Sequence, residues 1–431
     1  IAAVAGEHIV LKGFTHYPDF APRLDHRVQY DLDLYLPAER VRDAQQALIR
    51  LGYRPHTALE DFPTDHLPTL VRPSAWRWTG DYFDPEIPIS VDLHFRLWDE
   101  VTEGFSIPGL EEFWPRRFHL ADRLAYASLH LLRHLLRASV RPAHAREIAW
   151  FLDARRDDDG FWREWRELHP AGLRQAQAIA FRLAREWFGG RLHAIAEREM
   201  DALPDDVRSW FDAFGRPPFG TAKNELWLHL CLLDSARAKG AVIRRRLFPM
   251  RLPPPPDPPG APRGLGYLRH VATRARHHAV ALAPTLRDGL RWRFGDGYWR
   301  LVGGALLVSF GLFLFFLLYN LRLAELGYRV DAIGRIAGAM TAGSLVGALA
   351  AGWFRLNLAG IVGATAILFS LRTVVTGEPL LVASAFASGV GLALWQVSVP
   401  PAVAALIPEA RRPTAFGVFS ALAIGAGVIA G

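Results

Sequence analysis

The chain has 431 residues, a formal net charge of +7 and a composition that is 51% hydrophobic. Its length suggests about two or three domains. The only cysteine, Cys231, excludes an intramolecular disulfide and a cysteine-rich metal site. Because the sequence starts at Ile1 without a methionine and stops at Gly431 within an apolar run, we expect a piece of a longer protein.

The segment Val28–Leu36 alternates apolar residues with polar ones, which predicts a half-buried strand. The alternation places Asp31 and Asp33 on one face of this strand. Two neighbouring carboxylates repel each other, so the pair is stable mainly with a cation between them, and Mg²⁺ suits such oxygen ligands. The alternative is an ordinary solvated strand face that binds nothing.

A second strand of the same design is predicted over Ile89–Leu97. It carries Asp92 and His94 on its polar face. If the two strands pair in one sheet, Asp92 joins the earlier carboxylates, and three converging carboxylates suit two-metal phosphoryl transfer.

Two histidines near these acids have open alternatives. His66, in the proline-containing loop Asp61–Trp78, either contacts a nucleotide or is simply solvated. His94 either orients a phosphate or acceptor, or is hydrogen-bonded to a neighbouring carboxylate.

Between the two strands, the sequence of Pro37–Arg54 predicts a mostly helical segment, with Pro37 in its first turn. After the second strand, from about Leu120, the pattern is helical throughout. Arginine and tryptophan are interleaved in the later helices, but the aromatic spacing favours core packing over nucleic-acid binding. His130, His134 and His144 include a helical metal-pair spacing, yet no HExxH pattern completes it, and we interpret all three as structural.

The last part of the chain has the character of a membrane protein. A proline-rich boundary, Arg244–Pro262, precedes a basic aromatic segment, Tyr267–Arg300, which is typical of a helix on an anionic leaflet. Leu301–Asn320 is long and apolar enough to span a bilayer. Four more spans are predicted at about 333–354, 358–375, 380–407 and 415–431. Small-residue spacing, as at Gly343 and Gly347, favours close helix packing.

Polar and aromatic residues refine this membrane prediction. Trp292, Tyr298 and Trp299 suit the lipid headgroup region. Gln396, within a span, either contacts a ligand or makes an interhelical hydrogen bond. The arginine distribution shows a modest bias that agrees with a cytoplasmic N-terminal side, and together with the resemblance described next it implies a protein of the bacterial inner membrane.

The ordered motifs LKG, RxxxDLDLYL, LGYR and VDLHFRLW resemble the bacterial uncharacterised nucleotidyltransferases, of the polymerase-beta-like superfamily, over about Ile1–Met250. The resemblance implies a short mixed sheet with helices, Mg²⁺ or Mn²⁺ (two ions) as cofactor, and NTP as substrate. Asp31, Asp33 and Asp92 would be the catalytic metal ligands.

The same resemblance implies nucleotide binding by four other residues: Lys12, Gly13, His66 and His94. The wider superfamily has Gly-Ser where this chain has Lys12–Gly13, so phosphate binding would rest on Lys12 as a point charge. The acceptor would be a small molecule or a protein.

The motifs YNLRLAELGYRVDAIGRIAGAM and PPAVAALIPEARRPTAFGVFSALAIGAG resemble the first half of a major facilitator superfamily transporter. The expected architecture is therefore an α+β nucleotidyltransferase-like core (1–115), a helical domain completing it (116–250), a linker with a basic juxtamembrane segment (251–299) and an all-α transmembrane domain (300–431).

Three functions remain open. In the first, the N-terminal domain is an active nucleotidyltransferase. In the second, this domain is a nucleotide-binding regulatory module, or an inactive one, on a transporter. In the third, transport is the main activity, and the fusion couples it to modification of the transported compound.

Overall fold

In the computed structural model, the chain divides into two compact units, Ile1–Gly289 and Leu290–Gly431, here called the N-terminal unit and the C-terminal unit. The structure describes residues 6–23, 29, 31–55, 65–76, 84–110, 118–217, 220–248, 265–352 and 357–430. Several predicted features lie partly outside these residues: the start of the first acidic strand, most of the loop before Asp65 and the proline-rich boundary after Phe248.

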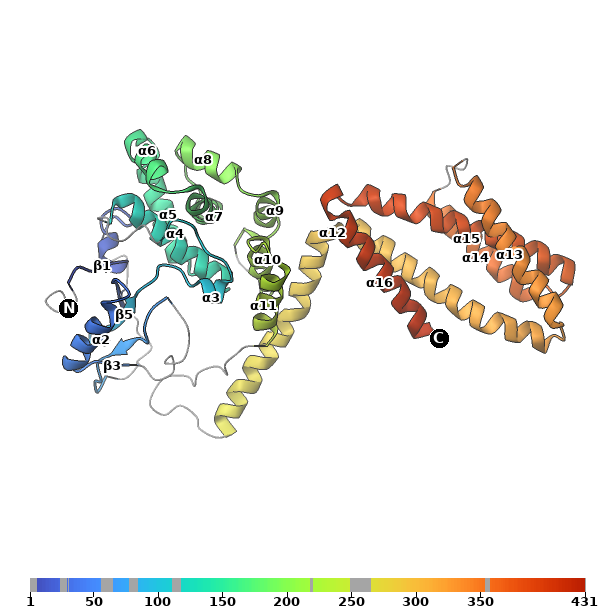
Figure 1. The fold of residues 1–431 in the computed structure, drawn as a ribbon, viewed down its shortest axis with the longest axis horizontal. Coiled ribbons are helices and arrows are strands. Elements are labelled where there is room, and N and C mark those ends of the chain that lie inside the picture. Colours follow the sequence, from blue (N-terminus) through green and yellow to red (C-terminus); the bar gives the residue numbers. More distant parts are fainter. Residues whose placement is uncertain are drawn as a thin grey trace. The chain divides into compact units, whose positions relative to one another are not determined.

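The N-terminal unit begins with a mixed sheet of five short strands in the order β1-β2-β5-β4-β3 (Figure 1). The strands are β1 Ile9–Val10, β2 Asp31–Tyr35, β3 Arg54–Pro55, β4 Leu70–Val71 and β5 Ser90–His94. β2 and β5 are parallel neighbours, whereas β1, β4 and β3 pair in antiparallel fashion. The two predicted acidic strands are therefore adjacent at the centre of the sheet.

One face of the sheet is covered by helix α2, Val41–Arg50. Its Val41 and Leu48 pack with the apolar residues of β2 and β5 in one buried cluster that includes Leu34 and Leu93. The predicted helical start at Pro37 is wrong, because residues 37–40 form a turn whose Pro37 carbonyl accepts from the amides of Arg40 and Val41. Since side chains alternate along a strand, the acidic residues point to the opposite face.

Helices form the rest of the N-terminal unit (Figure 1). They are η1 Gly13–His16, α3 Glu100–Glu103, α4 Leu120–Leu136, α5 Pro142–Ala154, α6 Asp159–Leu168, α7 Ala171–Phe188, α8 Ala194–Asp201, α9 Asp205–Phe214, α10 Glu225–Cys231 and α11 Ala236–Leu247. Trp162 and Trp165 are fully buried, so core packing of these aromatic residues is confirmed.

Helix α12, Leu265–Glu325, belongs to both units and has a non-helical residue, Gly295, within it. Its first part packs on the N-terminal unit, where Thr285 accepts a hydrogen bond from the amide of Lys223 at 2.8 Å and its carbonyl accepts one from Trp227 at 3.0 Å. The predicted leaflet-bound segment is thus partly packed on protein.

The C-terminal unit is helical: α13 Val330–Ala350, α14 Leu358–Val374, α15 Glu378–Leu406, η5 Glu409–Arg411 and α16 Arg412–Ala430. Four helices in the described part of the chain are long and apolar enough to cross a membrane: Leu268–Glu325, Val330–Ala350, Glu378–Leu406 and Arg412–Ile429. The remaining predicted span, at about 358–375, corresponds to a shorter apolar helix, Leu358–Val374. These helices are compatible with a membrane protein.

Small residues bring α13 and α15 together. A Cβ atom at Gly343 would clash with the carbonyl of Phe386, and one at Gly389 would clash with the carbonyl of Met340. Close approach of these backbones therefore requires glycine, as the small-residue spacing predicts.

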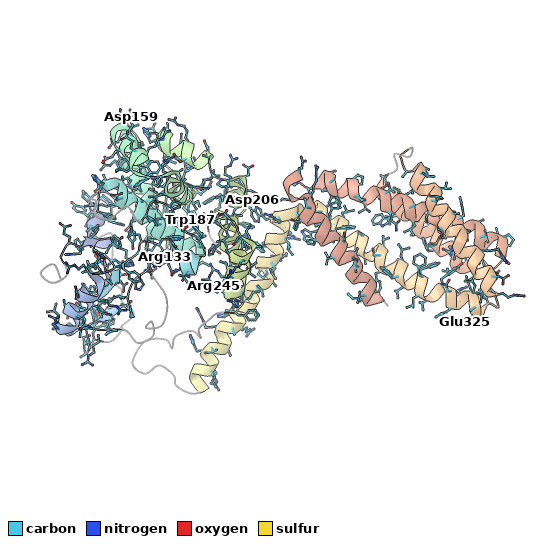
Figure 2. All side chains as sticks on the ribbon, in the orientation of Figure 1. Arg133, Asp159, Trp187, Asp206, Arg245 and Glu325 are labelled. Carbon is cyan, nitrogen blue, oxygen red and sulfur yellow. The ribbon has the colours of Figure 1, made fainter. Side chains whose placement is uncertain are left out.

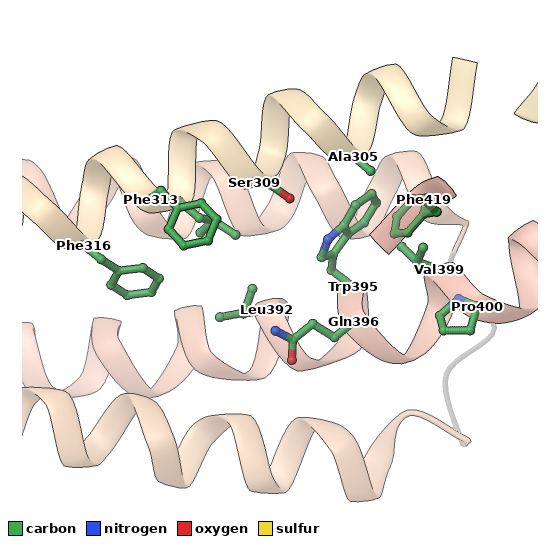
Figure 3. A pocket seen from close by; sticks show the side chains of 11 residues that line it. Ala305, Ser309, Phe313, Phe316, Leu392, Trp395, Gln396, Val399, Pro400 and Phe419 are labelled. Carbon is green, nitrogen blue, oxygen red and sulfur yellow. The ribbon is translucent and has the colours of Figure 1, made fainter. Parts of the chain in front are cut away.

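Two polar side chains that the sequence analysis singled out in the C-terminal unit are Tyr298 and Gln396. Tyr298, which the sequence predicts at the headgroup level, is fully buried within the C-terminal unit, and its hydroxyl donates to the carbonyl of Ala415 at 2.7 Å. Gln396 is exposed and lines a hollow of about 340 Å³ that also includes Ser309 and Trp395 (Figure 3).

Candidate functional site

The register of the two central strands brings the three predicted acids together. Asp33 on β2 is the direct neighbour of Asp92 on β5, and Asp31 lies two residues before Asp33 on the same face. One carboxylate oxygen from each of the three lies within 4.8 Å of the others. Asp33 is only 2% exposed, so the alternative of a solvated strand face is wrong for this residue.

Lys12 lies directly beside two of these acids. Its Nζ is 3.1 Å from Oδ2 of Asp31 and 3.1 Å from Oδ2 of Asp33. The contact with Asp31 is a hydrogen bond, whereas the contact with Asp33 is an ion pair without hydrogen-bond geometry. An ammonium group thus supplies part of the positive charge that the repelling carboxylates require.

The backbone after Lys12 turns sharply at Gly13, which has a φ of +83°. A Cβ atom there would overlap the Gln29 side chain. That side chain accepts from the amide of Phe14 at 3.0 Å and donates to the carbonyl of Asp31 at 2.7 Å. Gly13 is therefore required for a turn that is tied to the first acidic strand.

His94 is buried between two carboxylates. Its Nε2 lies 3.0 Å from Oδ1 of Asp33, and its Nδ1 lies 3.3 Å from Oδ2 of Asp65. Asp65 is also paired with Arg133 of α4, which Figure 2 labels. Of the two alternatives for His94, the structure contains the histidine bonded to neighbouring carboxylates, and its 1% exposure leaves no surface for a nucleotide.

The charges in this group shift each other's ionisation. Burial alone would lower the pKa of His94, but the hydrogen bond to Asp33 and the nearby carboxylate of Asp65 raise it to about 9. Burial would likewise raise the pKa of Asp33, but the hydrogen bond from His94 and the charge of Lys12 lower it to about 2. At neutral pH, His94 is therefore a cation and Asp33 an anion.

Asp92 is in a different electrostatic situation. Burial, together with the nearby charge of Asp33, raises its pKa, although His66 and Thr69 act in the opposite direction. Its Oδ1 is buried without a hydrogen-bond partner. Among the described residues, no cation lies within ion-pair distance of Asp92, whereas Asp31 has one such partner and Asp33 and Asp65 each have two.

His66 lies at the edge of this group. It forms an isolated antiparallel bridge with His94, and the two ring centroids are 5.0 Å apart. Its Nδ1 lies 2.6 Å from the carbonyl of Leu67. The loop histidine is thus half-buried beside the acids rather than freely solvated.

The donor set fits a hard divalent cation. Asp31, Asp33 and Asp92 offer converging carboxylate oxygens, which Mg²⁺ and Mn²⁺ prefer, and the unpartnered oxygen of Asp92 has no other compensation. A cation among the three acids would compete with the Lys12 ammonium group.

Sequence reasoning missed Asp65 and Arg133. Asp65 stands in a loop with no periodic pattern, and Arg133 stands on α4 among several other polar residues. The signal that could have found Arg133 is its place on α4 between buried leucines, because a largely buried guanidinium requires a carboxylate partner.

Comparison with known proteins gives one match for this part of the chain. Residues 5–189 match the family model described as uncharacterised nucleotidyltransferase. Searches of curated proteins and of solved structures gave no match. The matched range contains the whole group of acids with Lys12, His94 and Arg133. The part of the chain that builds this site is therefore similar to the uncharacterised nucleotidyltransferases.

Proposed function

We propose that the N-terminal unit transfers a nucleoside monophosphate from an NTP to a hydroxyl of a small-molecule or protein acceptor, with Mg²⁺ or Mn²⁺ as cofactor. The observation that carries this proposal is the buried, unpartnered Oδ1 of Asp92 beside Asp31 and Asp33, within a nucleotidyltransferase-like domain. A buried carboxylate oxygen without a partner is costly unless a ligand uses it.

In this proposal, Asp31, Asp33 and Asp92 would hold two divalent ions. Ions held there would supply positive charge for the phosphates and for the attacking and leaving oxygens. His94 positions Asp33 by its hydrogen bond and keeps that carboxylate ionised. Arg133 and Asp65 hold His94 from the other side.

The reaction joins the acceptor oxygen to the α-phosphorus of the NTP and breaks the bond from that phosphorus to the bridging oxygen. Pyrophosphate leaves with the bonding electrons. The acceptor proton would pass to Asp92, which lies on the same face of the sheet as Asp31 and Asp33. Lys12 moves from the carboxylates to the phosphates, and the Gly13 turn and His66 line the nucleotide side of the site.

A specific observation favours a second candidate, a module that binds a nucleotide without catalysing nucleotidyl transfer. Lys12 already forms ion pairs with both Asp31 and Asp33. If the ammonium group stays there, it takes the place of a metal ion, and the domain binds a nucleotide and regulates the attached C-terminal unit.

For the C-terminal unit, we propose a transporter-like membrane domain of the major facilitator type, with the N-terminal unit on the cytoplasmic side. Its apolar helices and the hollow beside Ser309 and Gln396 support this proposal. Transport coupled to modification of the transported compound joins the two proposals.

The test is incubation of the purified full chain in detergent with each α-labelled NTP, Mg²⁺ or Mn²⁺, and a bacterial metabolite extract. We expect label transfer that Asp33→Asn reduces by about 100-fold or more, since metal ions contribute several kcal/mol of charge stabilisation. The matched control is Asp43→Asn, which removes an exposed carboxylate on α2.

Nucleotide binding without label transfer would support the regulatory module instead. Equal label transfer by Asp33→Asn and the unaltered chain would overturn the assignment of the site.

A further inference from the structure

A second group of side chains with metal-ligand chemistry lies in the helical part of the N-terminal unit. His130 and His134 are one turn apart on α4, and His144 lies in the first turn of α5. Their ring centroids are 4.5, 4.6 and 5.1 Å apart, and one nitrogen from each ring lies within 4.8 Å of the others. Three nitrogen donors therefore converge at one point.

The backbone around these histidines holds them firmly. A short turn joins α4 to α5, and within it the amide of Ser139 donates to the carbonyl of His134 at 2.9 Å. The Ser139 hydroxyl lies 3.1 Å from Nδ1 of His134. A hydrogen bond at one nitrogen fixes the orientation of the ring and leaves the other nitrogen as a ligand, as is usual for metal-binding histidines.

The three rings are largely shielded from solvent, since His130 is 7% exposed and His134 and His144 are half-buried. A cavity of about 10 Å³ adjoins His130 and His144 and is also lined by Lys12 and Glu147. This is about the space of one water molecule.

We propose that His130, His134 and His144 bind one divalent d-block ion of the Zn²⁺ class. Three imidazole ligands leave one position of a tetrahedral ion open. The adjoining cavity provides about the space of one water molecule beside His130 and His144. Nitrogen ligands distinguish this site from the carboxylate group, because imidazole suits Zn²⁺ and Co²⁺ whereas carboxylates suit Mg²⁺ and Mn²⁺.

The competing interpretation is that the three rings only pack against one another. It predicts no selective metal binding. The two interpretations differ in what the unaltered chain does, so the decisive measurement does not depend on a variant that folds poorly.

The test uses the full chain, purified in detergent, stripped with a chelator and titrated with Co²⁺ in a large excess of Mg²⁺, which occupies oxygen sites. We expect one equivalent of Co²⁺ to bind with the visible absorption of a low-coordinate nitrogen-ligated ion, and Zn²⁺ to displace it. We expect Co²⁺ binding to weaken by about 100-fold or more in His134→Gln and, separately, in His144→Gln. This loss exceeds what is typical when a residue that only hydrogen-bonds to a metal ligand is removed.

Two variants serve as controls. His277→Gln removes an exposed histidine of α12, and Asp33→Asn alters the cluster formed by Asp31, Asp33 and Asp92. Both variants should bind Co²⁺ as the unaltered chain does. The proposal is overturned if the unaltered chain binds no Co²⁺ under these conditions. It is also overturned if Asp33→Asn abolishes the absorption while the histidine variants retain it.

Discussion

The ammonium nitrogen of Lys12 lies 3.1 Å from Oδ2 of Asp33, a carboxylate that is almost completely buried. A side-chain cation thus occupies the neighbourhood in which a metal ion would be expected. Metal binding, nucleotide binding and the position of Lys12 are therefore linked by electrostatics.

Replacing Lys12 by methionine tests this link. We expect Lys12→Met to bind Mn²⁺ roughly tenfold more tightly or better, because two unit charges a few ångströms apart interact by several kcal/mol near a protein surface. The same change should weaken NTP binding, since the phosphates lose a point charge. Calorimetric titration with Mn²⁺ and with NTP measures both effects.

Lys239→Met on α11 is the matched control for this experiment and should change neither affinity. Unchanged Mn²⁺ affinity in Lys12→Met would show that the ammonium group does not compete with the ion.

The bond between His94 and Asp33 makes stability depend on pH. Because folding raises the pKa of His94 from 6.5 to about 9, its contribution is fully present below pH 6.5 and is lost as the pH rises through about 9. Because folding lowers the pKa of Asp33 from 3.8 to about 2, its contribution is present above pH 3.8 and is lost as the pH falls through about 2.

We expect the free energy of unfolding of the N-terminal unit to fall by a few kcal/mol between pH 6.5 and 9. His94→Gln should be less stable at neutral pH and should lack most of this alkaline fall. Thermal unfolding followed by circular dichroism at a series of pH values provides the measurement. A parallel fall in both proteins would mean that another group is responsible.

Arg133 compensates the buried charge of Asp65, which is 2% exposed. Arg133→Met should destabilise the N-terminal unit by about 3–5 kcal/mol, because it leaves a buried carboxylate with too little positive charge. Asp65→Asn in the same chain should restore much of the loss, since an amide requires no counter-ion. Chemical denaturation of both variants measures the coupling, and equal stability of the single and double variants would contradict it.

Two glycines on α13 allow a matched comparison in the C-terminal unit. A Cβ atom at Gly343 would clash with the backbone of α15, whereas one at Gly338 would have no neighbour within 4 Å. We expect Gly343→Ala to lower the thermal unfolding temperature in detergent, because the two helices must separate. Gly338→Ala should leave it unchanged or raise it slightly, since alanine favours the helix. Equal effects would show that α13 and α15 do not pack as described.

The sequence by itself determined the features that follow from local periodicity. Alternation along β2 and β5 put Asp31, Asp33 and Asp92 on the polar faces of two strands, because successive side chains of a strand point to opposite sides. Long apolar runs determined the membrane-like helices, and the spacing of Gly343 and Gly347 determined where backbones approach.

Only the tertiary structure decided which distant groups meet. Arg133 reaches Asp65 across 68 residues, and His94 reaches Asp33 across 61. No local pattern encodes such a pair, because a charged side chain on a helix or loop looks the same in sequence whether its partner is water or a buried carboxylate. Tyr298 also shows that the sequence does not determine which groups meet. Its aromatic ring suits a membrane surface, but packing of α16 against α12 buries it. The convergence of His144 with His130 and His134 likewise depends on the turn between α4 and α5. That turn sets the distances from the His144 ring to the other two rings, which the spacing of the residues in the sequence does not determine.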